Sequence, residues 1–387
     1  MKEKYCKIPK FRFNKFLESW KRLKYEDVIE VNSGKDYKHL EKGDIPVYGT
    51  GGYMLSVSEA ITNKDGVGIG RKGTINKPYI LKAPYWTVDT LFFCIPKNKY
   101  NLYFINAIFE RTQWERFDES TGVPSLSKLT INNIQNYFPS FDEQSAIGSL
   151  FRTLDDLLAS YKDNLANYQS LKATMLSKMF PKAGQTVPEI RLDGFEGEWK
   201  LYELKSRAET ITKGTTPKDK SWQGEVNYIK TESINRDTGS LVRTASTSLD
   251  EHLGYLKRSI LKEDDVLFSI VGTLGVVGIV DKKDLPANTN QQIAIIRLKR
   301  DDAIFMLNFL KSPRIKSFIK SDSTIGAQPS LSLWQIEKIK VSLPPSLEEQ
   351  QAICTYFSNL DNLINSHQEK ISQLETLKKK LLQDMFI

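Results

Sequence analysis

The sequence predicts an α+β protein: two mixed α/β globular bodies separated by a long antiparallel helical pair, with a pseudo-two-fold internal repeat. The main observation is a duplicated helical segment, "FDEQSAIGSLFRTLDDLL" from Phe141 and "LEEQQAICTYFSNLDNLI" from Leu347. Each copy follows short strand-like runs separated by turn residues, such as "DIPVYGTGGYM" and "IAIIRL". The length of 387 residues suffices for two domains with a core each. Since a wide internal repeat governs the fold, we expect two similar halves.

The repeat extends beyond the helical segments in both directions. "PSLSKLTINNIQNYFPSFDEQ" from Pro124 matches "PSLSLWQIEKIKVSLPPSLEEQ" from Pro329, and the match continues to Phe180 and Phe386. Near the start of each half, "IPKFRFNKFLESWK" resembles "VPEIRLDGFEGEWK". This match pairs Pro9 with Pro188, Arg12 with Arg191, Phe16 with Phe195 and Trp20 with Trp199. The expected segments are a first body at 1–140, a first helix at 141–180, a linker at 181–188, a second body at 189–345 and a second helix at 346–387.

Composition narrows the class of protein. A formal net charge of +8 and a pI of about 9.0 favour polyanionic partners to a modest degree. No apolar run reaches membrane-spanning length and the N-terminus has no secretory signal, so we expect a cytoplasmic protein that does not associate with a membrane. The cysteines (Cys6, Cys94, Cys354) and three histidines are too few and too scattered to predict disulfides or a metal site.

The two repeated helices carry start signals and an apolar seam. Ser140 and Ser346, each followed three residues later by Glu143 or Glu349, form a capping-box pattern. Apolar residues then recur at steps of four and three, which is typical of a coiled coil. Each helix of about 39 residues would be about 58 Å long. We assign helix pairing or partner docking to Ile147, Phe151, Leu154, Leu158, Leu165, Phe180, Ile353, Phe357, Leu360, Ile364, Ile371, Leu374 and Phe386.

The pattern leaves two questions about these helices open. The first is whether they pair with each other, which we prefer, or are ordinary core helices. The second is whether the remaining helix faces dock a partner protein or are merely solvated; these faces carry Lys172, Met179, Lys378 and Met385.

The bodies contain polar turns that suit contacts with a nucleic acid. "GVGIGRKGT" has the spacing G-x-G-x-x-G, but a turn and a strand follow instead of the helix that a dinucleotide site needs. Its glycines would let Arg71 and Lys72 approach a phosphate or a base edge; a tight hairpin with solvated basic residues is the alternative. In the second body "SIVGTLG" takes the matching place without the basic pair, and "NTNQQ" follows where the first body has "WTVDT". Asparagine and glutamine can pair with adenine in the major groove.

A basic, turn-like string stands near the front of each body: "SGKDYKHLEKG" and "TKGTTPKDKSWQG". The DNA-binding candidates of the first body are Lys35, Tyr37, Lys38, Tyr48, Gly70, Arg71, Lys72, Thr74, Thr87, Asp89 and Thr90. Those of the second body are Lys213, Thr215, Thr216, Lys218, Lys230, Thr231, Thr273, Asn288, Asn290, Gln291, Gln292 and Gln328. No catalytic or metal-binding set stands out, so the sequence predicts a protein that binds rather than catalyses.

The duplicated element "PSLS…LPPSLEEQQAI…LDNLI…LKKKLLQDMF" and the segment "VPEIRLDGFEGEWKLYEL" ahead of a body resemble the DNA specificity subunit of Type I restriction-modification systems. The first copy departs from that pattern with "FPSFDEQ", one residue shorter. The resemblance covers nearly the whole chain.

That resemblance implies two target recognition domains, each reading one half of a bipartite, asymmetric double-stranded DNA site. It further implies helices that set the spacer and dock two methyltransferase subunits for adenine methylation, with a restriction subunit joining for cleavage. The chain itself would have no cofactor, since S-adenosylmethionine, ATP and Mg²⁺ would bind partner subunits. A stand-alone DNA-acting enzyme and a coiled-coil adaptor remain the alternatives.

Overall fold

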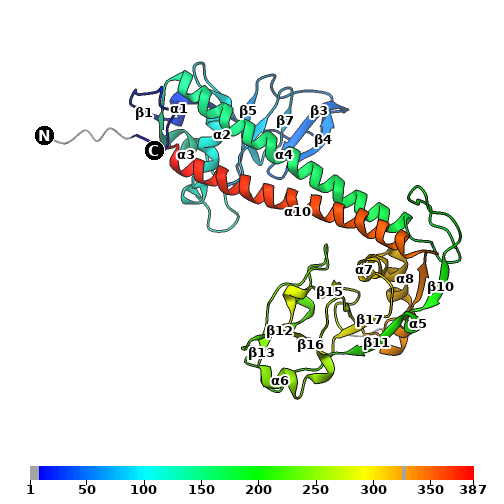
Figure 1. The fold of residues 1–387 in the computed structure, drawn as a ribbon. Coiled ribbons are helices and arrows are strands. Elements are labelled where there is room, and N and C mark those ends of the chain that lie inside the picture. The colour runs from blue at the N-terminus through cyan, green and yellow to red at the C-terminus, as the bar shows by residue number, and fades with distance from the viewer. Residues whose placement is uncertain (1–7, 325–327) are drawn as a thin grey trace. The chain divides into compact units, whose positions relative to one another are not determined.

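The computed structural model describes residues 8–324 and 328–387, so Cys6 lies outside the described residues. The chain forms two compact units (Figure 1). Unit 1 consists of residues 1–163 and 369–387, and unit 2 of residues 164–368. Each unit therefore contains a body and part of each long helix.

Unit 1 begins with a short strand and a single helical turn, continues with two small sheets, and ends in a long helix. Its elements are β1 (Lys21–Lys24), α1 (Tyr25–Val28), β2 (Ile29–Ser33), β3 (Lys42–Gly49), β4 (Gly52–Val57), β5 (Gly66–Gly70), β6 (Tyr79–Leu81), β7 (Trp86–Thr87), β8 (Leu91–Pro96), α2 (Leu102–Arg111), the 3₁₀ turn η1 (Trp114–Phe117), α3 (Lys128–Asn133), β9 (Gln135–Phe138) and α4 (Phe141–Lys178).

Unit 2 follows the same plan with more turns. Its elements are β10 (Lys200–Glu203), α5 (Leu204–Arg207), β11 (Ala208–Lys213), β12 (Val226–Ile229), η2 (Thr231–Ser233), β13 (Ser246–Thr247), α6 (Leu249–Leu253), η3 (Lys257–Ser259), β14 (Val266–Ser269), β15 (Val277–Ile279), η4 (Lys282–Asp284), β16 (Ala287–Thr289), β17 (Ile293–Leu298), α7 (Ala303–Lys311), α8 (Pro313–Asp322), α9 (Leu333–Glu337), β18 (Lys340–Leu343) and α10 (Leu347–Asp384).

The two bodies have the same sheet topology, although their sequences match only faintly. The larger sheet has the order β2-β8-β5-β6 in unit 1 and β11-β17-β14-β15 in unit 2, antiparallel throughout. The smaller sheet has the order β4-β3-β7 or β13-β12-β16, with one antiparallel and one parallel pairing in each case. A two-stranded ladder, β1-β9 or β10-β18, joins the lead-in segment of each unit to the strand before its long helix. The internal repeat is therefore a repeat of the whole fold.

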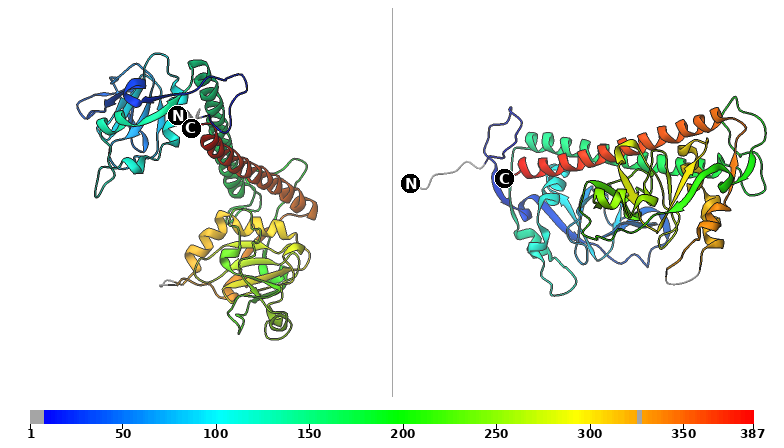
Figure 2. Two further views of the ribbon diagram at one scale, coloured as in Figure 1. Left: turned by 90° about the vertical axis from the view of Figure 1, so that its left-hand side faces the viewer. Right: turned by 60° about the horizontal axis from the view of Figure 1, so that its bottom comes forward.

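The long helices run antiparallel to each other within each unit, and they lie side by side in Figure 1 and in the right-hand view of Figure 2. In unit 1, Lys162 of α4 pairs with Glu375 of α10 at 2.7 Å, and Asp155 pairs further along α10 with Lys378. In unit 2 the rings of Tyr168 and His367 are 5.1 Å apart, centroid to centroid. The helical pair and the mixed α/β class are thus as the sequence predicts.

Aromatic residues anchor the ends of the long helices in the bodies. Phe180, just beyond α4, lies 6.2 Å from both Trp199 and Phe357, measured between ring centroids. Phe386, just beyond α10, lies 6.2 Å from Trp20 and 5.9 Å from Phe151. Of the thirteen assigned pairing positions, Leu165 and Ile371 are half-buried. The other eleven are buried: Ile147, Phe151, Leu154, Leu158, Phe180, Ile353, Phe357, Leu360, Ile364, Leu374 and Phe386.

The capping-box interpretation is wrong for the two glutamates. Ser346 does accept the N–H of Glu349 at 3.2 Å, but the carboxylate of Glu349 binds the guanidinium of Arg191 with two 2.8 Å contacts. Glu143 binds Arg12 in the same way, with two 2.7 Å contacts. Both carboxylates are almost fully buried, and a planar guanidinium satisfies a buried carboxylate better than one backbone N–H does.

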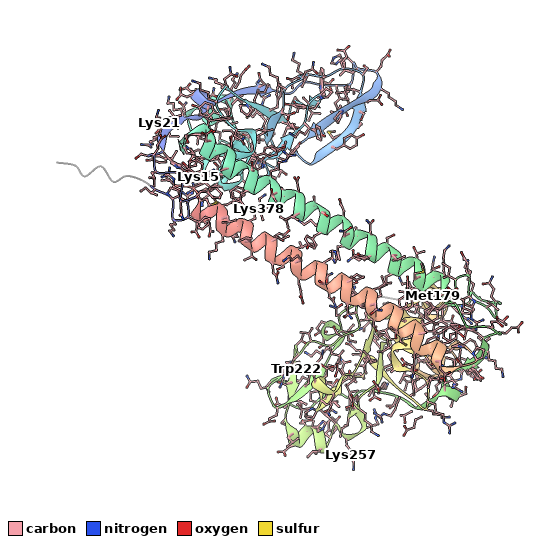
Figure 3. The ribbon with its side chains drawn as sticks, turned by 45° about the horizontal axis from the view of Figure 1, so that its top comes forward. Lys15, Lys21, Met179, Trp222, Lys257 and Lys378 are labelled. Atoms are coloured by element: carbon pink, nitrogen blue, oxygen red, sulfur yellow. The ribbon has the colours of Figure 1, made fainter. Side chains whose placement is uncertain are left out.

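Four residues were left open between partner docking and solvation, and most of them are buried. Met179 and Met385 are each 1% exposed. Lys172 is buried and Lys378 is half-buried, and they form ion pairs with Asp361 and Asp155 respectively (Figure 3 labels Met179 and Lys378). Both methionines and both lysines therefore stabilise the fold of their own unit.

Candidate nucleic-acid interface

Three segments of unit 1 that are far apart in the sequence meet in one place, which we call loop cluster 1 (residues 34–38, 71–74 and 88–90). The N–H of Lys35 donates to the carbonyl of Thr87 at 2.8 Å. The N–H of Arg71 donates to the carbonyl of Thr90 at 2.8 Å. The basic string, the glycine-rich turn and the "WTVDT" turn are thus fixed against one another by backbone hydrogen bonds.

Unit 2 builds an equivalent arrangement, loop cluster 2 (residues 214–218, 271–274 and 290–292). The N–H of Thr215 donates to the carbonyl of Thr289 at 2.9 Å, and the N–H of Ile270 donates to the carbonyl of Gln292 at 2.8 Å. The hydroxyl of Thr216 also donates to the side-chain oxygen of Gln291. "NTNQQ" and "WTVDT" therefore take the same place in the two units, as the sequence predicts.

Close backbone packing explains part of this shared geometry. A Cβ on Gly34 would lie 2.0 Å from the carbonyl oxygen of Val88, and one on Gly214 would lie 2.0 Å from that of Thr289. Both glycines are therefore required where the basic string crosses the neighbouring turn. The N–H of Gly73 donates to the carbonyl of Pro124 at 2.8 Å, and unit 2 has the equivalent bond from Gly272 to Pro329.

Most candidate side chains lie at the surface. The exposed ones are Lys35, Lys38, Lys72, Thr74 and Asp89 in unit 1 and Lys213, Lys218, Thr273, Gln291 and Gln328 in unit 2. The half-buried ones are Tyr37, Tyr48, Arg71 and Thr90 in unit 1 and Thr215, Thr216, Lys230, Thr231, Asn290 and Gln292 in unit 2. Loop cluster 1 is thus rich in cations, whereas the turns of loop cluster 2 are rich in amides and hydroxyls.

Three candidates are internal, so the prediction that they contact DNA is wrong. Thr87 and Asn288 are both 0% exposed. The amide of Asn288 donates to the carbonyl of Leu256 at 3.1 Å, and its oxygen contacts His252. Gly70 is buried, and a Cβ there would lie 2.0 Å from the carbonyl oxygen of Thr74. All three belong to strands, Gly70 to β5, Thr87 to β7 and Asn288 to β16, and each of these positions is buried.

Aromatic residues beside both clusters, the half-buried Trp222 and the exposed Tyr53 and Tyr255, were missing from the candidates. In unit 2 the ammonium of Lys230 lies 3.6 Å from the ring centroid of Trp222 (labelled in Figure 3), and that of Lys218 lies 4.8 Å from Tyr255. In unit 1 Tyr53 is 63% exposed, at the tip of the β3–β4 hairpin. A tryptophan within a lysine-rich string and a glycine pair flanked by tyrosines were the available signals. Aromatic faces next to cations suit bases and phosphates together.

Within residues 8–324 and 328–387 no group of three or more His, Cys, Asp or Glu side chains is placed to hold a metal ion. Cys94 and Cys354 are buried, and burial raises the pKa of both thiols, which disfavours the reactive thiolate. In the part of the chain that the structure describes, no helix is long and apolar enough to cross a bilayer.

The family model for the Type I restriction modification DNA specificity domain matches residues 18–167 and 196–376. The chain belongs to this family of Type I DNA specificity subunits. The two matched regions fall on the two halves of the repeat, so each body with part of a long helix corresponds to one specificity domain.

Among curated relatives, the Type I restriction enzyme MjaVIII specificity subunit of Methanocaldococcus jannaschii is 24% identical, over 68% of this chain and 64% of that protein. The EcoBI specificity subunit of Escherichia coli is 23% identical, over 95% of this chain and 86% of that protein. The chain covers 64% and 60% of the length of two of its M. jannaschii relatives.

Two solved structures share the fold. The S subunit of a Type I restriction-modification system from M. genitalium superposes with a TM-score of 0.68 at 16% identity, covering 98% of this chain and 99% of that one. A chain from work on complex assembly and conformational transition of the type I R-M system gives a TM-score of 0.54 at 14% identity, covering 96% and 98%.

Proposed function

We propose that this chain is the non-catalytic, sequence-specific DNA-binding subunit of a Type I restriction-modification complex that defends a cell against foreign DNA. Each unit reads one half of a bipartite, asymmetric site through its loop cluster. The observation that carries the proposal is the pair of equivalent clusters, built on one topology but with different side chains. Equivalent frames with unlike surfaces suit two half-sites of unlike sequence.

The partners follow from the same proposal. Two methyltransferase subunits dock on the chain and methylate adenine, and a restriction subunit joins them for cleavage. S-adenosylmethionine, ATP and Mg²⁺ bind those subunits, and the complex works in the cytoplasm. Support comes from family membership and from the E. coli and M. jannaschii relatives, which are named as specificity subunits.

The continuous long helices support a role as a spacer. Both α4 and α10 have 38 residues and pass from one unit into the other. A helix of that length measures about 57 Å at 1.5 Å per residue. That length exceeds the ~34 Å of one DNA turn, which is the usual distance between half-sites read by paired modules.

Exchange of one body tests the proposal. Replacing residues 20–125 with the body of a relative should change one half of the methylated motif and leave the other half intact. Altered specificity in both halves would contradict independent reading. A purified chain that cleaves or methylates DNA without partners would favour a stand-alone enzyme, and a chain that binds no DNA even with its methyltransferase would favour an adaptor.

A further inference from the structure

Unit 2 has a cleft of about 630 Å³ that no part of the proposed function uses. Its cationic walls come from Lys172 of α4, Lys311 of α7, Lys316 of α8 and Arg236 of the loop after η2. Thr273 of loop cluster 2 lines the same cleft. The cleft therefore opens next to the surface that we propose to face DNA.

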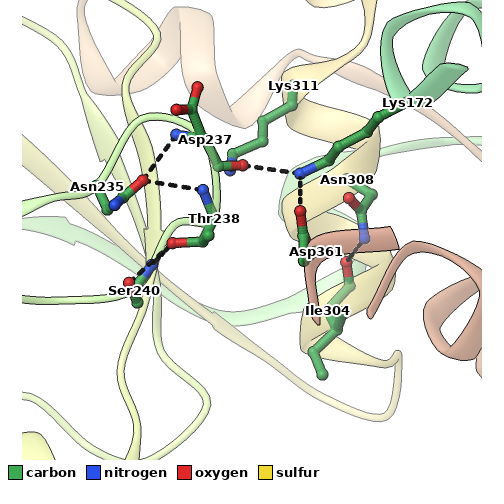
Figure 4. A network of polar contacts seen from close by, with 9 residues as sticks. All are labelled: Lys172, Asn235, Asp237, Thr238, Ser240, Ile304, Asn308, Lys311 and Asp361. Carbon is green, nitrogen blue, oxygen red and sulfur yellow. Dashed lines mark hydrogen bonds and ion pairs between the residues drawn. The ribbon is translucent and has the colours of Figure 1, made fainter. Parts of the chain in front are cut away.

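Two ammonium groups that line this cleft share one acceptor (Figure 4). Lys172 donates to the backbone carbonyl of Asp237 at 2.8 Å and pairs with the carboxylate of Asp361 at 2.5 Å. Lys311 donates to the same carbonyl at 3.0 Å. Among the described residues, no carboxylate forms an ion pair with Lys311, so only one of the two lysines has an ion-pair partner.

The electrostatics of Lys311 reflect its burial and the second ammonium beside it. Burial, and then the neighbouring ammonium of Lys172, lower the pKa of Lys311 to about 8. The carboxylates of Asp361 and Asp237 act in the opposite direction but do not restore the usual value. An anion in the cleft would stabilise the charged form of Lys311.

Unit 1 provides an internal comparison. There Lys378, the repeat equivalent of Lys172, pairs with Asp155, the equivalent of Asp361. Its other partner is Glu110 of α2, at 2.6 Å, in the place that Lys311 of α7 takes in unit 2. One ammonium thus forms ion pairs with two carboxylates in unit 1. In unit 2, two ammoniums share one backbone carbonyl and one ion-paired carboxylate. Since the same fold holds the carboxylate of Glu110 at this position in unit 1, folding does not require a lysine at the position of Lys311. We therefore look for a functional reason for Lys311.

We propose that this cleft binds a phosphate group of the DNA backbone beside the half-site that unit 2 reads. This inference rests on the proposed function. Lys311 supplies the charge that has no carboxylate partner, Lys316 and Arg236 supply exposed cations at the rim, and the Thr273 hydroxyl supplies a neutral donor. Charge-assisted hydrogen bonds to phosphate oxygens are among the stronger polar contacts in proteins. Such a contact fixes the register of the DNA without reading a base.

Salt-dependent DNA binding tests the proposal with the full chain in complex with its methyltransferase subunits. Loss of one phosphate contact reduces the slope of log Kobs against log[salt] by about 0.9. The affinity advantage of wild type over Lys311→Gln should therefore shrink about 3.5-fold between about 50 and 200 mM salt. Lys311→Arg should keep the wild-type slope. Lys299→Gln is the matched control, because Lys299 is exposed just after β17, at the opposite end of that strand from Gln292.

Lys311→Glu reproduces the arrangement of unit 1 and should fold with a melting temperature close to that of wild type, while it binds DNA more weakly than Lys311→Gln does. A wild-type salt slope in Lys311→Gln overturns the phosphate site but leaves the proposed function standing. No DNA binding by the wild-type complex overturns the proposed function itself.

A scan of the duplex locates the contact. Neutral methylphosphonate groups are placed one at a time along the backbone, and each duplex is measured with wild type and with Lys311→Gln. At one position, the methylphosphonate should weaken DNA binding by wild type and leave DNA binding by Lys311→Gln unchanged. Inorganic phosphate serves as a second probe. If free phosphate binds at Lys311 but no backbone position distinguishes wild type from Lys311→Gln, the assignment to DNA is overturned.

Discussion

The two buried arginine–glutamate pairs provide the sharpest test of how each lead-in segment is fixed to its unit. Arg191→Ala would leave the carboxylate of Glu349, which is 2% exposed, without its charged partner. Removal of one member of a buried pair costs about 3–5 kcal/mol, since the other charge stays buried. We therefore expect the free energy of unfolding of unit 2 to fall by about that amount.

Comparison of the two units refines this magnitude. After Arg191→Ala, Glu349 keeps a 3.2 Å hydrogen bond from the indole N–H of Trp199. The equivalent indole N–H of Trp20 has no hydrogen-bond partner among the described residues, so Glu143 lacks this second donor in unit 1. A hydrogen bond to a charged group contributes about 1.5–3 kcal/mol. Arg12→Ala should therefore destabilise unit 1 more than Arg191→Ala destabilises unit 2.

Native-state hydrogen exchange, read by mass spectrometry on peptides from the first turns of α4 and α10, reports the two units separately. Lys205→Ala is the control, because its ion pair with Glu337 is exposed on the lysine side, and such pairs contribute at most about 1 kcal/mol. The double variant Arg191→Met/Glu349→Met should recover most of the loss, as apolar replacement of a buried pair often does. An Arg191→Ala variant no less stable than Lys205→Ala would refute the reasoning.

Three further predictions concern the loops, the cleft and the helices. Gly214→Ala places a Cβ 2.0 Å from the carbonyl oxygen of Thr289, so it should destabilise unit 2 by about 1–3 kcal/mol and weaken DNA binding, as measured by melting and by titration with duplex. The pKa of Lys311 is lowered to about 8 in the folded state, so the unfolded chain binds more protons between pH 8 and the ordinary lysine pKa. The free energy of unfolding of wild type, relative to that of Lys311→Gln, should therefore rise with pH across that window. Urea unfolding measures this difference, and a difference that does not change with pH would contradict the prediction. Deletion of about one heptad from either α4 or α10 should change the spacer of the methylated motif or abolish assembly, and an unchanged spacer with full activity would count against the helices as a ruler.

The sequence predicts the helical pair well because its signals are local and repeated. A seam of four- and three-residue steps and a duplicated start require no knowledge of distant contacts. The equivalence of the two bodies is visible only in traces, such as Gly73 and Gly272 and the "PSLS" segments. Both traces lie at equivalent backbone hydrogen bonds, which run from the N–H of Gly73 to the carbonyl of Pro124 and from the N–H of Gly272 to the carbonyl of Pro329.

The errors have a common physical cause, which is that partners distant in sequence override local patterns. Glu143 fits a capping box, yet its partner Arg12 lies 131 residues earlier. The helical pattern leaves Lys172 either docking a partner or solvated, yet it pairs with Asp361, 189 residues later. Asn288 suits adenine recognition by residue type, but its strand turns it inward against His252. Periodicity cannot show which residue of a short polar turn faces the core.

Methylation-sensitive sequencing of the host genome, with and without this gene, tests the central claim most directly. If the chain is the specificity subunit of its complex, the gene should be required for adenine methylation at one bipartite motif whose two halves differ in sequence. The same methylated motifs in both strains, or a gene-dependent motif that is a single continuous site, would contradict two units that each read one half.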